Sequence, residues 1–375
     1  MWSRSRALWA SAAARFWRVA MPLARPAVAV GVSLALMETL NDIGASEFLG
    51  VRSLTVSIYT TWVTRSDLPG AAQIALAMIV LVIALVSLER WARRRQRYSI
   101  TAQRARSFAP KPLKGKAAAL ALVLGLLPVV FGFLLPAGYL AVEAWKRFQF
   151  AGLSGKLLIE ARNTTLSALA TVAVLVCGLV VAFAARSYPQ RGMQAVSRIS
   201  TLGYAMPGTV LALGILIATA GFDFLDAQAR EWLGVSTGLL LIGSGAALGY
   251  AYLARFLAIS VGSVEAGLTR IPRSYDQAAR TLGHSLTGTF RHVHLPLSKA
   301  AIAAAGLLVF VDCMKELSAT LLLRPLNFET LATHLYGEAA RGTYEEASIA
   351  ALAIVVVGIL PVILLARIGR NEQQG

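Results

Sequence analysis

Long apolar stretches separated by short charged segments dominate the chain. A helix needs about 20 mostly apolar residues to cross the hydrocarbon core of a bilayer. By this criterion the pattern predicts an all-α, polytopic membrane helix bundle with eight spans. They are expected at Pro26–Leu40, Leu68–Leu88, Ala117–Val142, Asn163–Ala185, Ile199–Phe222, Leu233–Ala254, Ser298–Leu323 and Ala347–Ala366.

Composition and charge placement agree with a membrane protein. The 375 residues are 57% hydrophobic and 15% charged, whereas soluble chains carry about 25% charged residues. The net charge of +17 does not indicate a nucleic-acid partner, because the basic residues lie between apolar spans, where the positive-inside rule explains them. That rule places both termini in the cytoplasm. It also assigns one inside loop to Arg255, Arg270, Arg273, Arg280, Arg291 and Lys299.

The chain contains an internal repeat. Residues Phe16–Leu23 parallel Phe290–Leu297 at an offset of 274, and the same offset pairs Glu38 with Asp312, Asn41 with Lys315 and Asp42 with Glu316. We therefore predict two tandem units. Residues 1–89 would form the end of a first unit with two spans, 90–116 a basic cytoplasmic linker, and 117–375 a second unit with six spans. The first unit is expected to be incomplete and the chain N-terminally truncated, because no counterpart of the other four spans precedes residue 26.

Charged residues within the apolar repeats are candidates for function. A charge at mid-membrane costs about 2.5–3.5 kcal/mol on insertion scales, so such residues usually face a bundle interior or a wet cavity. One interpretation is a net-acidic lining of a translocation route. The alternative is that these side chains end their helices at the outer interface. The candidates are Glu38, Asn41, Asp42, Asp312, Lys315 and Glu316.

A spaced motif lies between the sixth and seventh predicted spans. Gln277-Ala278-Ala279 is followed after three residues by Gly283, and after nine more by Val293, one residue, and Leu295-Pro296. This resembles the EAA loop of ABC-importer permeases, with Gln277 in place of Glu and Val293 in place of Ile. The alternative is an ordinary amphipathic loop helix. The resemblance spans 265–297 and implies that an ATPase subunit docks on Asp276, Gln277, Ala278, Ala279, Arg280, Gly283, Leu295 and Pro296.

Further stretches, at 203–212 and 314–325, resemble the fused permeases of ferric-iron ABC importers. That resemblance implies a type I, MetI-like permease in the bacterial inner membrane. It also implies a periplasmic binding protein that delivers Fe(III), and two copies of an ATPase subunit. Related permeases carry thiamine, polyamines, sulfate or aminophosphonates, so these cargoes remain alternatives.

Chemistry within the chain itself is sparse. No G-x-x-x-x-G-K-[ST] run is present, so ATP is expected to bind a partner subunit. His292 and His294 lack a third metal ligand at a diagnostic spacing, and we predict neither a bound metal nor a cofactor. We therefore predict a transport subunit without catalytic residues. A secondary transporter remains a rival, since it would also have repeats and intramembrane acids. A membrane enzyme would have to use Asp312, Lys315 and Glu316.

Overall fold

The computed structural model describes residues 16–94, 113–188, 190–234 and 240–374, which are helical without any strand. Apolar composition and closed backbone hydrogen bonding make the helix the expected element in a bilayer. The helices before residue 95 are η1 (Phe16–Ala20), α3 (Met21–Asn41), α4 (Gly44–Phe48), α5 (Leu54–Tyr59), η2 (Thr60–Thr64) and α6 (Leu68–Arg94). The later ones are α7 (Lys116–Val129), η4 (Val130–Leu134), α8 (Leu135–Ala151), α9 (Gly155–Val172), α10 (Val174–Ser187), α11 (Arg191–Ser200), η5 (Gly203–Ala205), α12 (Gly208–Leu233), α13 (Ala246–Thr269), α14 (Arg273–Thr281), α15 (Leu286–Thr289), η6 (Phe290–His294), α16 (Leu295–Met314), α17 (Ser318–Leu323), α18 (Leu331–Arg341) and α19 (Tyr344–Gln374).

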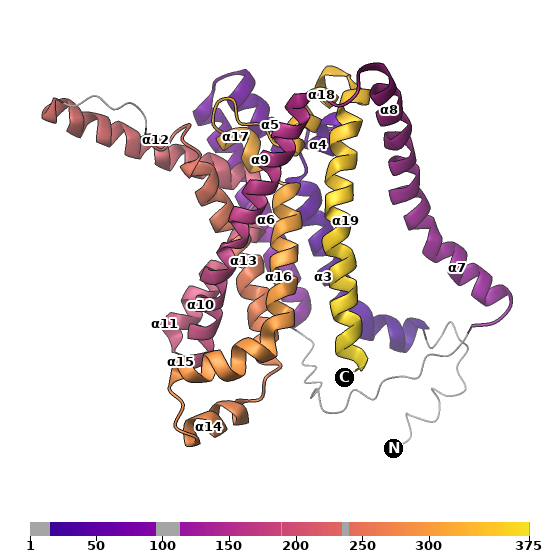
Figure 1. Cartoon of the computed structure of the whole chain (residues 1–375), viewed down its shortest axis with the longest axis vertical. Helices are drawn as coiled ribbons and strands as arrows, with labels where there is room; N and C mark the ends of the chain where they lie inside the picture. The colour runs from indigo at the N-terminus through magenta and orange to yellow at the C-terminus, as the bar shows by residue number, and fades with distance from the viewer. Residues whose placement is uncertain (1–15, 95–112, 189, 235–239, 375) are drawn as a thin grey trace.

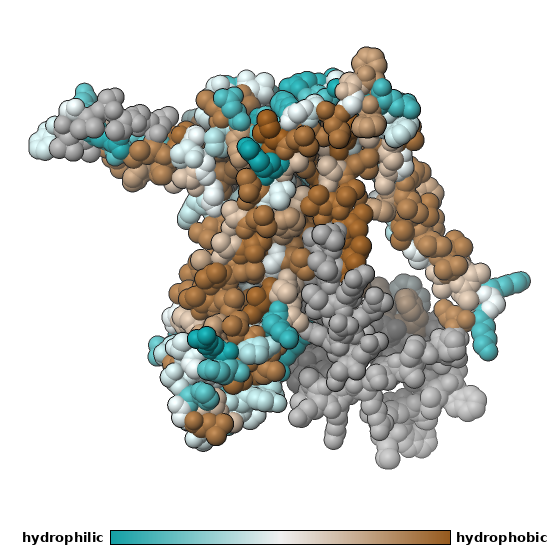
Figure 2. Space-filling model, in the orientation of Figure 1, coloured by the Kyte–Doolittle hydropathy of each residue, from teal (hydrophilic) through white to brown (hydrophobic). Residues whose placement is uncertain are grey.

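The long helices run between two polar ends of the molecule. Helices α14 and α15 lie at the lower end in Figure 1, as does the C-terminal end of α19, while α4, α5, α17 and α18 lie at the upper end. Brown, hydrophobic surface fills the zone between these ends, and the polar surface gathers above and below it (Figure 2). This distribution matches a protein that crosses a bilayer along the vertical direction of the view.

Six helical stretches in the described part of the chain are long and apolar enough to span a membrane. Helices α3 and α19 cover the first and last of the eight predicted spans. Most of the predicted linker, residues 95–112, lies outside the described residues, and α6 continues to Arg94. The six stretches are Leu68–Leu88, Lys116–Ala151, Gly155–Ser187, Gly208–Trp232, Ala246–Thr269 and Leu286–Met314.

Three predicted boundaries were wrong, each because a polar or glycine-containing break was hidden in an apolar run. The fifth span is interrupted before Gly208, where Pro207 precedes the first turn of α12. The sixth begins at Ala246, after Gly245 with a φ of +80°, and not at Leu233. The seventh stops at Met314, and α17 forms a separate short helix.

The same error misplaced Arg255. The predicted sixth span ended at Ala254, which put Arg255 in an inside loop. In the structure Arg255 lies within α13 and is 6% exposed. The hydropathy pattern registered its charge as the end of a helix, whereas the helix continues for another 14 residues to Thr269.

Helix α13 is the centre of the bundle, with extensive contacts to α10 and α16. Small residues allow the close approach: a Cβ added at Gly178 of α10 would lie 1.9 Å from the hydroxyl of Ser260 in α13. A second apolar core joins the first 94 residues to α12. There Val210 and Leu213 of α12 pack with Ile58 and Met78 from the first 94 residues. The early helices are therefore part of the same bundle.

Candidate functional site

A cavity of about 540 Å³ lies where α3 and α4 meet α16 and α17. We call this cavity the acidic cavity. Helix α16 begins at the α14–α15 end of the bundle and ends, 20 residues later, at the acidic cavity. A helix of this length rises about 30 Å. All six intramembrane candidates from the sequence line it: Glu38, Asn41, Asp42, Asp312, Lys315 and Glu316.

Glu316 is the most buried of these side chains. Its carboxylate lies 2.9 Å from Nε of Arg255, and both side chains are less than a tenth exposed. The backbone N–H of Ala319 also donates to Glu316 Oε1 at 3.0 Å, at the first turn of α17. A buried carboxylate needs such partners because leaving it unpaired in a low dielectric is costly. Glu316 thus holds α13 to the break between α16 and α17.

Asn41 at the end of α3 joins the early helices to the rest of the cavity wall. Its side-chain Oδ1 accepts the N–H of Gly208 at 2.6 Å, and its carbonyl accepts the hydroxyl of Ser318 at 2.9 Å. One turn earlier, Glu38 accepts a hydrogen bond of 2.9 Å from the hydroxyl of Tyr204. Polar contacts therefore connect α3 to η5, α12 and α17.

The remaining charges are more open. Lys315 Nζ lies 3.0 Å from Asp312, and the lysine side chain is 57% exposed. The carboxylate of Asp42 accepts the N–H of Ala45 at the start of α4. Glu38 and Asp42 are both exposed and form no ion pair in the described part of the chain. Within those same residues, no group of three His, Cys, Asp or Glu side chains is placed to hold a metal ion.

Two partners of the cavity acids, Arg255 beside Glu316 and Tyr204 beside Glu38, were missed by the sequence analysis. Arg255 was assigned to a loop, and Tyr204 was not among the predicted site residues. A single arginine inside an apolar run is itself a signal, because such residues face a bundle interior or a wet cavity. Its partner Glu316 is 61 positions away, and nothing in the spacing indicates the pairing.

The EAA-like motif forms a separate polar unit at the other end of α16. We call residues 273–294, which comprise α14, α15 and η6, the coupling loop. Gly283 has a φ of +82°. The N–H of Gly283 donates to the carbonyl of Arg280, and that of His284 to the carbonyl of Ala279, as in a Schellman motif. The glycine of the motif therefore ends α14.

Ion pairs attach the coupling loop to the bundle. Asp276 contacts Nη2 of Arg186 at 3.0 Å and Nε2 of the buried His294. Arg186 also donates to the carbonyls of Leu268 and Ile271. Asp276 is therefore an internal anchor of the loop. Asp276 is half-buried and Ala279 is buried, whereas the other predicted docking residues are exposed: Gln277, Ala278, Arg280, Gly283, Leu295 and Pro296.

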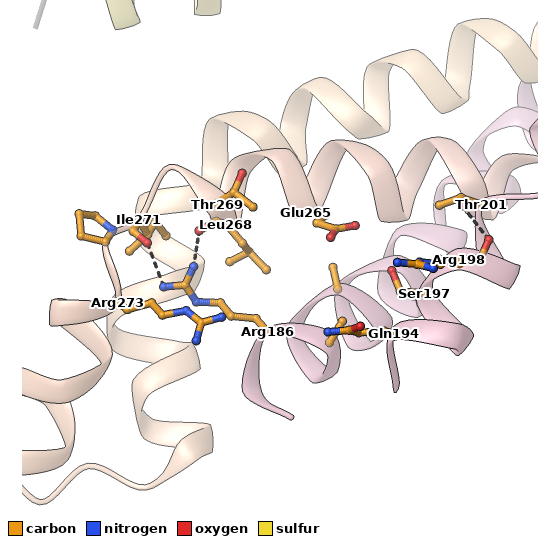
Figure 3. A pocket seen from close by; sticks show the side chains of 13 residues that line it. Arg186, Gln194, Ser197, Arg198, Thr201, Glu265, Leu268, Thr269, Ile271 and Arg273 are labelled. Carbon is orange, nitrogen blue, oxygen red and sulfur yellow. Dashed lines mark hydrogen bonds between the residues drawn. The ribbon is translucent and has the colours of Figure 1, made fainter. Parts of the chain in front are cut away.

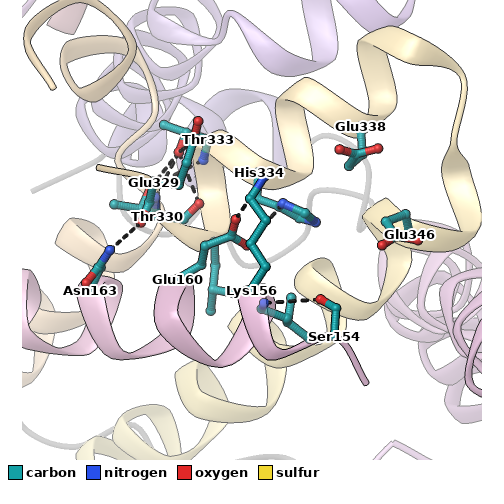
Figure 4. Close-up of polar contacts among 12 residues, drawn as sticks. Ser154, Lys156, Glu160, Asn163, Glu329, Thr330, Thr333, His334, Glu338 and Glu346 are labelled. Atoms are coloured by element: carbon teal, nitrogen blue, oxygen red, sulfur yellow. Dashed lines mark hydrogen bonds and ion pairs between the residues drawn. The ribbon is translucent and has the colours of Figure 1, made fainter. Parts of the chain in front are cut away.

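The bundle end opposite the coupling loop carries another polar cluster (Figure 4). Glu160 of α9, which is 1% exposed, lies 3.0 Å from Nδ1 of His334 in α18. Nearby, Glu329 pairs with Arg324 and accepts a hydrogen bond of 2.7 Å from Thr333. These contacts fix the α17–α18 segment onto α9. The start of α17 forms part of the wall of the acidic cavity, so that part of the wall is held in place as well.

Sequence comparison identifies the family. The family described as binding-protein-dependent transport system inner membrane component matches residues 2–98 and 175–370. The chain belongs to this family. Its members are permease subunits, so the chain is a transport subunit that crosses the membrane several times, as the helices indicate.

Individual relatives carry different cargo names. An Fe(3+)-transport system permease protein of Haemophilus influenzae is 24% identical over 359 residues, which cover 94% of this chain and 67% of that protein. A ferric transport system permease protein of Actinobacillus pleuropneumoniae is 23% identical, with 93% and 51% covered. The chain thus spans about half to two thirds of these two relatives. A putative 2-aminoethylphosphonate transport system permease protein of Salmonella typhimurium is 26% identical, with 70% and 97% covered.

The fold also has a solved counterpart. A chain from the crystal structure of a bacterial alginate ABC transporter, in complex with an alginate-bound periplasmic protein, superposes with a TM-score of 0.55. Its identity is 17%, and 68% of this chain and 95% of that chain are covered. The likeness confirms the predicted all-α type I permease fold.

Proposed function

We propose that the chain forms the translocation pathway of an ABC importer in a bacterial inner membrane. A periplasmic binding protein would deliver ferric iron to the α17–α18 end. Two copies of a separate ATPase subunit would dock on the coupling loop at the opposite end. The observation that carries the proposal is the placement of the coupling loop and the acidic cavity at the two ends of α16. A movement of the loop would thereby reach the cavity through one rigid helix.

The acidic cavity is proposed as part of the route because helices from both ends of the sequence build it. The two stretches matched by the family, 2–98 and 175–370, support two tandem units. In this proposal residues 1–89 belong to the first unit, 90–116 to a cytoplasmic linker and 117–375 to the second. Membrane transporters built from repeats commonly bind their cargo at the interface between the repeats.

The charges of the cavity favour a hard cation as cargo. Arg255 neutralises Glu316 and Lys315 neutralises Asp312, which leaves Glu38 and Asp42 without an ion pair in the described residues. Carboxylate oxygens are preferred ligands of hard cations. Two acids, with no third metal ligand placed beside them in the described part of the chain, suit passage better than tight capture, since a transported ion must also leave. The two ferric relatives support iron as that cation.

An aminophosphonate is the second candidate. The observation in its favour is the Lys315 ammonium, more than half exposed at the cavity, which is suited to an anionic group. The relative from Salmonella typhimurium, matched over 97% of its length, carries that cargo in its name.

Reconstituted transport tests the proposal. The full chain, an ATPase subunit and a binding protein encoded beside it would be combined in proteoliposomes, and uptake of radioactive Fe(III) measured. Glu38→Gln keeps an acceptor for the Tyr204 hydroxyl, and Asp42→Asn keeps an acceptor for the N–H of Ala45, so both remove charge alone. We expect iron uptake to fall in both, and to be unchanged in Glu345→Gln, an exposed acid outside the cavity.

The outcomes separate the parts of the proposal. Uptake of an aminophosphonate in place of iron would show that iron is the wrong cargo, while the assignment as a permease would stand. Normal iron uptake by both charge-neutral variants would show that Glu38 and Asp42 do not act on the cation. Transport that proceeds without any ATPase subunit would identify a secondary transporter instead.

A further inference from the structure

A second large cavity, of about 590 Å³, lies at the coupling-loop end of the bundle, between α10, α11 and the junction of α13 with α14. We call it the basic cavity. Three arginines from three different helices line it: Arg186 from α10, Arg198 from α11 and Arg273 from α14 (Figure 3). Glu265 is the single acid of its lining, so the wall is net positive.

Arg186 is held in place. Its side chain is 11% exposed. Its terminal nitrogens donate hydrogen bonds to the carbonyls of Leu268 and Ile271 and to the carboxylate of Asp276. Its Nε is buried and has no hydrogen-bond partner among the described residues. Arg198 and Arg273 are exposed, and no side-chain partner is recorded for either among those residues. The neutral donors Gln194, Ser197 and Thr201 complete the polar wall.

This set of groups suits a phosphate. Guanidinium groups recognise phosphate oxygens through paired, charge-assisted hydrogen bonds. A carboxylate ligand would use only one such fork, whereas a phosphate has enough oxygens to accept from both Arg198 and Arg273. Hydroxyl and amide donors on α11 add neutral hydrogen bonds to the same oxygens.

The surroundings indicate a lipid source for that phosphate. The basic residues of this end place it on the cytoplasmic side by the positive-inside rule. Helix α11 carries Val196 and Ile199, 46% and 66% exposed, beside the polar side chains that face the cavity. An amphipathic helix of this kind lies at the boundary between headgroups and acyl chains. Basic pockets between membrane helices on this side are known to bind anionic headgroups.

We propose that the basic cavity binds the phosphate headgroup of an anionic phospholipid, with the acyl chains along α11. Binding would join α11 to the start of α14, and so connect the lipid composition of the inner leaflet to the coupling loop. The exposed docking residues Gln277 and Arg280 do not line this cavity. The site is therefore separate from the predicted docking residues, although Arg273 is also the first residue of the coupling loop, and it does not depend on the identity of the cargo.

Native mass spectrometry of the purified full chain tests this. Phosphatidylglycerol and phosphatidylcholine with the same acyl chains would be titrated, and the retained lipid counted. We expect phosphatidylglycerol to bind more tightly, and Arg198→Gln or Arg273→Gln to weaken it by about tenfold or more, since each removes a charged hydrogen bond. Arg191→Gln is the matched control: it removes the same charge from the same helix, at a position outside the cavity. A melting curve for each variant checks that it is folded.

Competition separates the two sources of phosphate. We expect inorganic phosphate and glycerol 3-phosphate to displace phosphatidylglycerol only weakly, because they lack acyl chains. Equal binding of both lipids would overturn the proposal, as would equal losses in Arg198→Gln and Arg191→Gln. Displacement by glycerol 3-phosphate at the affinity of the lipid would overturn the lipid assignment and identify a soluble phosphate compound as the ligand.

Discussion

Arg255 of α13 and Glu316, at the break between α16 and α17, form a buried ion pair with 2.9 Å between Nε and Oε2. Glu316 lines the acidic cavity, and the pair lies next to Gly208, where an added Cβ would lie 3.0 Å from both side chains. Three helices therefore meet at one charge pair. Because desolvation of the two ions offsets much of their attraction, such a pair is better understood as fixing this arrangement than as a source of stability.

We predict that Glu316→Gln destabilises the protein by about 3–5 kcal/mol, because Arg255 is left buried without its counter-ion. Replacing both residues, as Arg255→Met with Glu316→Gln, should cost less than Glu316→Gln alone. Thermal unfolding of the purified protein measures both. Asp312→Asn, four residues earlier in α16, is the control. Its partner Lys315 is mostly exposed, so the loss should stay below about 1 kcal/mol. Equal losses for the two acids would contradict the importance of burial.

Gly208 at the start of α12 is predicted to tolerate no side chain. In Gly208→Ala the new Cβ would lie 3.0 Å from Arg255 Nη1, Glu316 Oε1 and the Cβ of Ser318. Overpacking of this kind costs about 1–3 kcal/mol. Gly214→Ala, on the same helix, meets nothing within 4 Å and should be neutral or stabilising by up to about 1 kcal/mol. The difference in melting temperature between the two variants is the measurement. A smaller effect at 208 than at 214 would show that the α12–α13 junction relaxes.

The sequence predicted the acidic cavity better than it predicted the helices around it. The 274-residue offset paired Glu38 with Asp312 and Asp42 with Glu316, and all four line one cavity. Repeats conserve a spatial relationship that hydropathy cannot detect. Helix ends were predicted less well because an arginine inside a membrane helix gives the same hydropathy signal as a loop residue when its partner is unknown. Arg255 was misplaced for this reason, since Glu316 neutralises it only in the folded bundle.

Glu329 is predicted to make stability depend on acid pH. Burial raises its pKa, but hydrogen bonds from Arg324 and Thr333 outweigh that effect, so the pKa lies below its ordinary value of 4.5. A carboxyl group with a lowered pKa stabilises the fold above the unfolded value, and this contribution disappears as the pH falls through the folded value. The side chain is 30% exposed, so the effect should be at most about 1 kcal/mol. Melting temperatures between pH 7 and pH 3 should fall less steeply in Glu329→Gln than in the parent; identical slopes would exclude Glu329 as a contributor.

Gly283 gives the sharpest test of the coupling loop. Its φ of +82° ends α14 and lets the N–H groups of Gly283 and His284 close the helix. A residue with a Cβ pays about 1–2 kcal/mol in this conformation, and a β-branched one is worse suited still. Gly283→Val should therefore misplace the exposed residues Gln277 and Arg280, while the membrane spans, which Gly283 does not contact, remain folded. We expect the variant to reach the membrane at the parental level and to lose its ATPase subunit on purification.

Gly283→Asn is the matched control, because asparagine accepts left-handed backbone angles more readily than other residues, and it should retain the ATPase. Retention of the ATPase by Gly283→Val, or its equal loss from both variants, would show that the shape of this turn does not determine docking.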